Sequence, residues 1–162
     1  MKPKATVPAD FALEEFLPYR LSVAANRTSR LFARRYSEEF GLSIPEWRVL
    51  AVVGRFGGLS ASAVVERTAM DKVKVSRAVR ALLARGLLAR EGDAEDRRVQ
   101  RLAMTAEGRA VHARILPLAR GLEAELLAGT SVADRAALHR LLDALDRRLT
   151  EMGAGPGAEG PD

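Results

Sequence analysis

Apolar side chains recur every three or four residues along most of this 162-residue chain, which is the spacing of one buried face of a helix. The first such segment begins near Pro18, a residue that fits the first turn of a helix, and reaches Phe40 without an internal glycine. A helix of this length spans roughly 35 Å, at about 1.5 Å per residue. This is longer than a small compact domain needs, so we expect part of the helix to contact a partner.

Three helices follow after short breaks. A capping box of Ser43 and Glu46 opens the first of them, because the serine hydroxyl and the glutamate carboxylate can each accept a free backbone N–H. Ser60 can cap the second, short helix, and Asp71 can cap the third, which ends before Gly86. A short helix, a brief turn and a longer helix form a helix-turn-helix unit, whose later helix lies in the major groove of DNA.

Two short apolar segments, 87–89 and 99–104, flank a charged turn after these helices. They predict a β-hairpin whose tip holds Arg97 and Arg98. Thr105 and Ser131 can then cap a fifth and a sixth helix. The expected fold class is therefore mainly α with a small β-hairpin wing, in which a winged helix-turn-helix domain is flanked by N- and C-terminal dimerisation helices.

The sixth helix carries a stripe of leucines on one face. They are Leu138, Leu141, Leu142, Leu145 and Leu149. Burial of even ~100 Å² of each leucine is favourable by a few kcal/mol, at about 25 cal/mol per Å². The small winged domain offers little surface for this stripe, so we expect a second copy of the chain to cover it. The expected organisation is a flexible tail (1–9), an N-terminal dimerisation arm (10–42), the winged DNA-binding domain (43–104), C-terminal dimerisation helices (105–152) and a disordered tail (153–162).

Positive charge is concentrated around the helix that Asp71 caps. Segment 67–101 contains ten basic and five acidic residues, an excess equal to the formal net charge of the whole chain, +5. Such a local basic excess is typical of a domain that binds a polyanion. The candidate DNA contacts on the polar face of this helix are Lys72, Lys74, Ser76, Arg77 and Arg80. The alternative is a surface helix whose charges face only water, and the 22 arginines against 4 lysines can also reflect genome composition.

Residues that carry enzyme chemistry are scarce. The chain has no cysteine, which excludes a disulfide framework, a thiolate metal site and a cysteine nucleophile. Its two histidines, His112 and His139, lie in no hydrolase or metalloprotease motif, and no phosphate-binding glycine loop is present. We therefore expect no catalytic residue, metal site or cofactor. No secretory signal or long apolar run appears, so we expect a cytoplasmic protein without a membrane partner.

Four motifs stand in a fixed order along the chain. They are PEWRVL at 45–50, DKVKVSRAVRALLARGLLAR at 71–90, DAEDRR at 93–98 and LAMTAEGR at 102–109. With these motifs the chain resembles the MarR family of dimeric winged helix-turn-helix transcription regulators, over about 17–152. The resemblance implies a sequence-specific double-stranded DNA-binding regulator, a repressor that acts as a homodimer on a pseudo-palindromic operator. The alternative function is a winged helix used for protein or RNA contacts.

The resemblance also implies roles for individual residues. Those that would enter the major groove are Lys72, Lys74, Ser76 and Arg77. Arg97 or Arg98 would enter the minor groove, where a guanidinium gains from negative potential, and Asp96 would hold the wing tip in shape. The family often has small hydroxyl residues where this chain has Val73 and Lys74, so base preference is not transferred. Val73 could instead contact a thymine methyl group.

Regulators of this family often respond to a small aromatic or anionic effector bound between the dimer arm and the winged domain. The candidate residues for such a pocket are Tyr19, Asn26, Arg27 and Trp47. Trp47 also suits the core, and Arg27 also suits a solvated surface or a contact between subunits. We interpret His112 as a packing or surface residue rather than a sensor.

Overall fold

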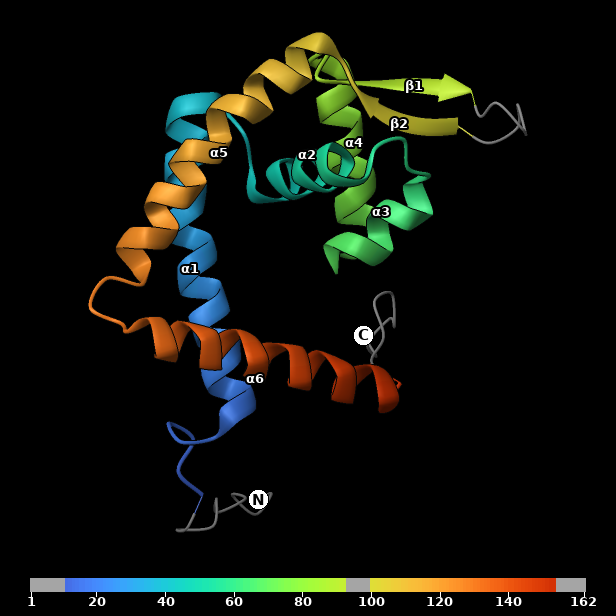
Figure 1. Cartoon of the computed structure of the whole chain (residues 1–162). Coiled ribbons are helices and arrows are strands. Elements are labelled where there is room, and N and C mark those ends of the chain that lie inside the picture. Colours follow the sequence, from blue (N-terminus) through green and yellow to red (C-terminus); the bar gives the residue numbers. More distant parts are fainter. Residues whose placement is uncertain (1–10, 93–99, 154–162) are drawn as a thin grey trace, which may run out of the picture.

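The computed structural model describes residues 11–92 and 100–153. Within these ranges the chain forms six helices and one two-stranded antiparallel sheet (Figure 1). In chain order the elements are α1 (Leu17–Phe40), α2 (Ile44–Phe56), α3 (Ala61–Thr68), α4 (Lys72–Ala84), β1 (Leu88–Gly92), β2 (Gln100–Met104), α5 (Ala106–Leu126) and α6 (Val132–Glu151). The predicted fold class, mainly α with a β-hairpin, is confirmed. No helix in the described part of the chain is long and apolar enough to cross a membrane.

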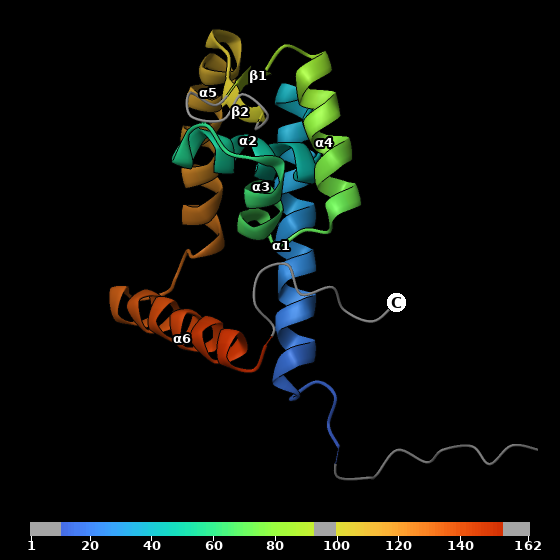
Figure 2. The same cartoon turned by 90° about the vertical axis from the view of Figure 1, so that its right-hand side faces the viewer.

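The helices form two regions that differ in shape. The helices α2, α3 and α4 and the hairpin gather into the winged domain, and α1 and α5 run side by side away from it (Figure 1). From the far end of α5, α6 turns aside and stands apart from α1 in the view of Figure 2. The winged domain therefore sits at one end of a two-helix support.

The predicted helix starts are confirmed by the hydrogen bonds that cap them. The Ser43 hydroxyl accepts from the Glu46 N–H at 3.4 Å, and the Glu46 carboxylate accepts from the Ser43 N–H at 2.8 Å. The Asp71 carboxylate accepts from the Lys74 N–H at 2.7 Å at the start of α4. Gly41, with φ of 61°, ends α1 in the left-handed region that favours glycine.

The hairpin differs from its predicted boundaries. β1 begins at Leu88 and continues to Gly92, past the apolar segment from which it was predicted, because its outer residues pair with β2 although they are polar. The register places Leu88 opposite Met104 and Gly92 opposite Gln100. Leu59, which precedes α3, also pairs with Leu102 through two backbone hydrogen bonds of 3.1 and 2.8 Å. This bridge attaches the wing to the helix-turn-helix.

One apolar core fills the winged domain and extends to α1 and α5. Its largest fully buried side chains include Tyr36, Leu42, Leu50, Leu82 and Ile115. These residues come from α1, the α1–α2 connection, α2, α4 and α5. Shared burial therefore connects the orientation of α4 to that of α1 and α5.

The far half of the molecule leaves many large apolar side chains uncovered in the single chain. No residue of α6 is buried, and Leu141 on its leucine stripe is 64% exposed. The N-terminal part of α1 and the segment before it also expose large apolar side chains, namely Phe11, Leu13, Phe16, Leu17, Tyr19 and Leu21. The expected tails, 1–9 and nearly all of 153–162, lie outside the described residues.

Candidate nucleic-acid interface

The helix α4 has one buried face and one charged face. Val75, Val79 and Leu82 anchor the buried face in the core. The predicted contact residues on the opposite face are all exposed, namely Lys72, Lys74, Ser76, Arg77 and Arg80. The spacing of the buried residues thus orients the basic side chains outward, as the sequence predicts.

The first turn of α4 holds one lysine in place. Lys74 Nζ lies 2.9 Å from Asp71 Oδ2, and the hydrogen bond from the Lys74 side chain is the main reason that the pKa of Asp71 is lowered. Both side chains are exposed, so the pair contributes little to stability. Within 11–92 and 100–153, Lys72, Arg77 and Arg80 have no hydrogen bond or ion pair from their side chains. Their charges are available to a partner.

A groove lies beside this charged face. It runs between the start of α2 and the middle of α4, and its lining residues are Ser43, Pro45, Glu46, Lys74, Arg77, Ala78 and Ala81. Lys74 and Arg77 supply positive charge there and Glu46 supplies negative charge, and the Ser43 and Glu46 N–H groups at the start of α2 are already paired within the capping box. The groove is therefore part of the α4 surface rather than a separate anion site.

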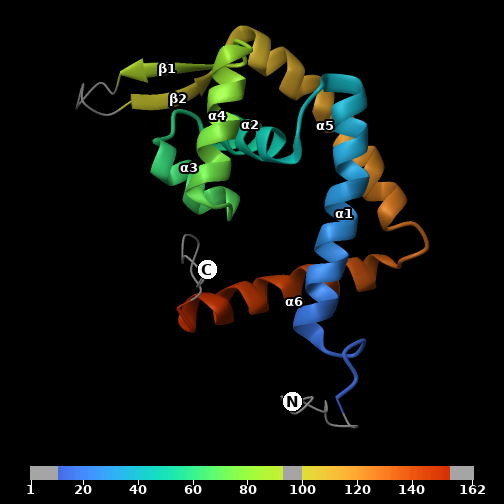
Figure 3. The same cartoon turned by 180° about the vertical axis from the view of Figure 1, so that it is seen from behind.

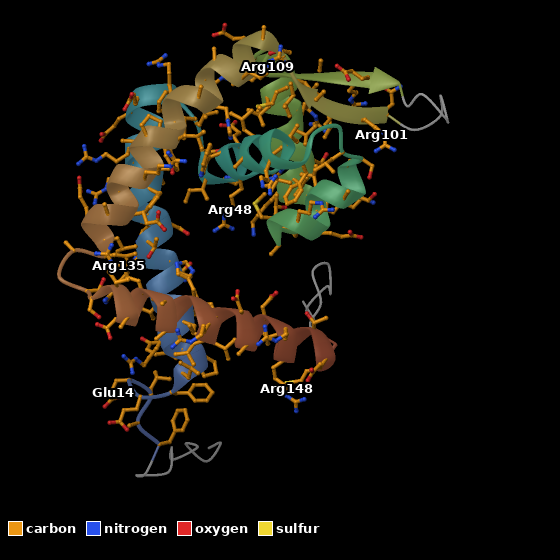
Figure 4. The ribbon with its side chains drawn as sticks, viewed as in Figure 1. Glu14, Arg48, Arg101, Arg109, Arg135 and Arg148 are labelled. Atoms are coloured by element: carbon orange, nitrogen blue, oxygen red, sulfur yellow. The ribbon has the colours of Figure 1, made fainter. Side chains whose placement is uncertain are left out.

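The root of the wing is fixed by several hydrogen bonds. Thr105 Oγ1 donates to the Gly86 carbonyl at 2.6 Å, and the Thr105 N–H donates to the Leu87 carbonyl at 3.2 Å. Farther along β2, the Arg101 guanidinium donates to the Gly58 carbonyl at 3.2 Å, near the outer end of the hairpin in Figure 4. The predicted wing residues Asp96, Arg97 and Arg98 lie outside the described residues.

Of the four candidate effector residues, Tyr19 lies far from Trp47 within one chain. Trp47 packs against the core, with ring centroids 5.1 Å from Tyr36 and 6.0 Å from His112. Tyr19, Asn26 and Arg27 are exposed on α1. Tyr19 precedes Tyr36 by 17 positions, so roughly 25 Å of helix separates it from the Trp47 contact, at about 1.5 Å per residue.

The sequence analysis did not identify the partners of two residues, although it interpreted His112 as a packing or surface residue. His112 stacks on Trp47, and its burial lowers the pKa of the imidazole. A Cβ atom on Gly54 would lie only 3.0 Å from His112 Nε2, so glycine permits this close packing of α2 on α5. Arg85 hydrogen-bonds to the C-terminal end of α1 and therefore does not belong to the free basic surface. No local pattern could reveal either role, because the partners lie far away along the chain.

Comparison with known proteins identifies the family. Residues 40–99 match the MarR family. A MarR family transcriptional regulator from Silicibacter pomeroyi DSS-3 is 31% identical, covers 85% of this chain and 100% of its own, and superposes with a TM-score of 0.71. BpsR of Bordetella bronchiseptica, whose DNA binding is regulated by 6-hydroxynicotinic acid, is 28% identical over 85% of this chain and 97% of its own, with a TM-score of 0.76. The transcriptional regulator HosA of Escherichia coli O127:H6 (strain E2348/69 / EPEC) is 28% identical over 103 residues, 64% of this chain and 76% of HosA.

The structural features and the comparisons support the same family assignment. The matched structures superpose on most of this chain, whose described part holds a helix-turn-helix, a hairpin attached beside it and two long helices that support them. The matched family segment contains α2, α3 and α4, the helices that form the charged surface. The chain therefore belongs to the MarR family of DNA-binding transcriptional regulators.

Proposed function

We propose that this protein is a homodimeric, ligand-responsive repressor that binds a pseudo-palindromic operator in double-stranded DNA. The observation that carries the proposal is the division of α4 into a face locked in the core and an exposed basic face on the opposite side. A helix held this way can enter the major groove as a rigid unit, because its orientation does not depend on the charges that meet the DNA. Its Arg77 is suited to hydrogen bonds with a guanine edge.

The homodimer is argued from the apolar surface that one chain leaves uncovered. The helix α6, which carries the exposed leucine stripe, and the start of α1, which exposes large apolar side chains, lie at the end of the molecule away from the wing (Figure 3). Large exposed apolar patches of this kind mark protein interfaces. A second copy that covers them would place two α4 helices about a two-fold axis. Half-sites would then lie about one helical turn, ~10 base pairs, apart.

The wing supplies the second part of the proposed DNA contact. Its hairpin extends outward from the winged domain, and the MarR resemblance assigns a minor-groove contact to Arg97 or Arg98 and a supporting role to Asp96. A contact of this type adds affinity without reading much sequence. Together with the basic face of α4, it predicts binding that weakens steeply with salt, with a slope of about −0.9 per phosphate contact.

Ligand response is proposed by analogy with BpsR, whose regulation by 6-hydroxynicotinic acid involves a chain of similar fold. Tyr19 lies too far along α1 from Trp47 to share a pocket with it within one chain. A pocket that used all four would need both copies of the dimer. The effector would release DNA only if it bound the two dimer geometries with different affinity.

The proposal is tested by fluorescence anisotropy with the promoter fragment that the purified protein protects. Arg77→Ala should weaken binding by about 1–3 kcal/mol and relax base preference at one position of each half-site. Arg120→Ala, which removes an exposed arginine from α5, is the matched control and should bind as the wild type does. Equal binding by Arg77→Ala would show that α4 does not read the bases. Equal affinity for duplex RNA would favour a different partner, because the major groove of RNA is too narrow for a helix.

A further inference from the structure

Arg85 joins the C-terminal end of α4 to the C-terminal end of α1. It follows the last residue of α4, and its guanidinium extends to the C-terminus of α1, more than 40 residues earlier in the chain. Nη1 donates to the Gly41 carbonyl at 2.9 Å, and Nη2 donates to the Phe40 carbonyl at 2.8 Å. The planar fork of an arginine is suited to two neighbouring carbonyl oxygens, whereas a lysine presents a single point charge.

The end of α1 needs such a partner. The left-handed Gly41 directs its own N–H to the Ser37 carbonyl and the next N–H to the Tyr36 carbonyl, so the Phe40 and Gly41 carbonyls are left for other donors. The last turn of α1 contains no basic residue. Since the C-terminus of a helix carries partial negative charge, the Arg85 guanidinium supplies the positive charge that α1 lacks.

A third helix end meets the same guanidinium. Glu46 Oε2 lies 4.0 Å from Arg85 Nη1 and also accepts the Ser43 N–H of the α2 capping box at 2.8 Å. The Glu46 side chain is only 16% exposed, and that of Arg85 is 38% exposed. The carboxylate is therefore held by α2 and in turn restrains the arginine. The ends of α1 and α4 and the start of α2 meet at this one side chain.

We propose that Arg85 is a positioning residue that sets the tilt of α4 relative to α1, and with it the operator half-site spacing that the dimer accepts. This inference rests on the proposed homodimer, in which the α1 helices of the two copies hold the two α4 helices at a fixed separation. With 13 residues, α4 is roughly 20 Å long, at about 1.5 Å per residue. If α4 tilts by about 10° about its Arg85 end, its N-terminal end at Lys72 moves by roughly 3.5 Å, which is close to the ~3.4 Å rise of one base pair.

The test compares DNA fragments that differ only in half-site spacing. The probes carry the protected promoter segment with its half-sites at the natural separation or one base pair closer or farther apart. Wild type should prefer the natural spacing by about tenfold or more. Arg85→Met, which keeps the apolar stem and removes the donors, should lose about tenfold in affinity at the natural spacing and less than twofold at the others. Its salt dependence should stay unchanged, because Arg85 makes no phosphate contact in this proposal.

Two further variants separate positioning from general stability. Arg109→Met removes a similar bond, from Arg109 Nη1 to the Met104 carbonyl at 2.8 Å, that joins neither α1 nor α4, and it should keep the spacing preference. Glu46→Gln retains a capping side chain but removes the charge beside Arg85, and it should weaken the preference partially. Thermal unfolding of each variant monitors stability independently of DNA binding.

Several outcomes would overturn the proposal. An equal loss of affinity at all three spacings, or a lower Tm with an unchanged spacing preference, would make Arg85 a stabilising residue only. A shallower salt dependence for Arg85→Met would mean that the guanidinium contacts DNA instead. A wild-type protein that binds no duplex, or binds as a monomer, would overturn the proposed function as well, which distinguishes that failure from a failure confined to Arg85.

Discussion

Replacement of Gly108 by alanine tests how closely the root of the wing packs onto α5. Gly108 lies in the first turn of α5, where its N–H donates to the capping Thr105 hydroxyl at 2.9 Å. A Cβ atom at this position would overlap the Leu87 carbonyl oxygen and lie 3.0 Å from the carbonyl carbon. That carbonyl accepts the Thr105 N–H at 3.2 Å, so it cannot turn away without loss of the hydrogen bond.

The size of the effect follows from these contacts. Forced overlap in a packed region costs about 1–3 kcal/mol, and the upper end applies here because the neighbour is backbone rather than a flexible side chain. A weakened bond between Thr105 and Leu87 costs about 1 kcal/mol more. Alanine regains about 1 kcal/mol through its helix propensity. The free energy of unfolding should fall by about 3 kcal/mol, or roughly 10 °C in Tm for a chain of this length.

Urea denaturation followed by circular dichroism measures this change, at one protein concentration because self-association would add stability. Gly121→Ala is the matched control, since Gly121 lies in the same helix, is exposed, and a Cβ atom there would meet no other atom within 4 Å. It should gain up to about 1 kcal/mol. If Gly108→Ala were as stable as Gly121→Ala, the Leu87 backbone could not pack against Gly108 as closely as described.

Three further predictions concern the DNA surface, the arm and the core. Val73 is 58% exposed on α4 between two lysines, so replacement of the thymine it contacts by deoxyuridine should weaken wild-type binding about fourfold, at ~0.8 kcal/mol per buried methyl-sized group. The same replacement should not change the affinity of Val73→Ala, and a scan of all operator thymines that finds no such position would refute the contact. Leu141→Glu on the leucine stripe of α6 should shift sedimentation toward monomer, whereas a dimer as tight as wild type would place the interface elsewhere. Burial lowers the pKa of His112 below its ordinary 6.5, so the unfolded state takes up the proton first as the pH falls. The free energy of unfolding should therefore fall as the pH drops from 6.5 toward the pKa of the folded state. His112→Phe should lose this part of the pH dependence in urea titrations, and a profile equal to that of wild type would contradict the prediction.

The helix starts were predictable from short stretches of the chain. At Ser43, Asp71 and Thr105 the capping side chain and the N–H it accepts are three residues apart. Such a bond depends on local geometry alone, so residue type and spacing suffice to predict it. The same applies to the buried and exposed faces of α4, which follow from the 3.6-residue period. The exposure of the basic candidate residues on α4 was therefore predicted residue by residue.

What joins these elements could not be predicted in this way. The bonds from Arg85 to the end of α1, the bridge from Leu59 to Leu102 and the stack of Trp47 on His112 all connect distant segments. In the sequence, Arg85 is one more positive charge near the DNA surface, and only its partners reveal a different role. The four candidate effector residues share a plausible composition, yet the length of α1 separates Tyr19 from Trp47.

The sequence by itself determined where each helix begins, which face of it is apolar and where positive charge collects, because these properties arise among residues within about one helical turn. Only the tertiary structure decided which helix ends meet at Arg85, how closely Gly108 lets the wing root lie on α5, and which apolar surface remains uncovered. These properties depend on the relative orientation of whole elements. That orientation is the outcome of packing all of their side chains at once, so no single stretch of the chain encodes it.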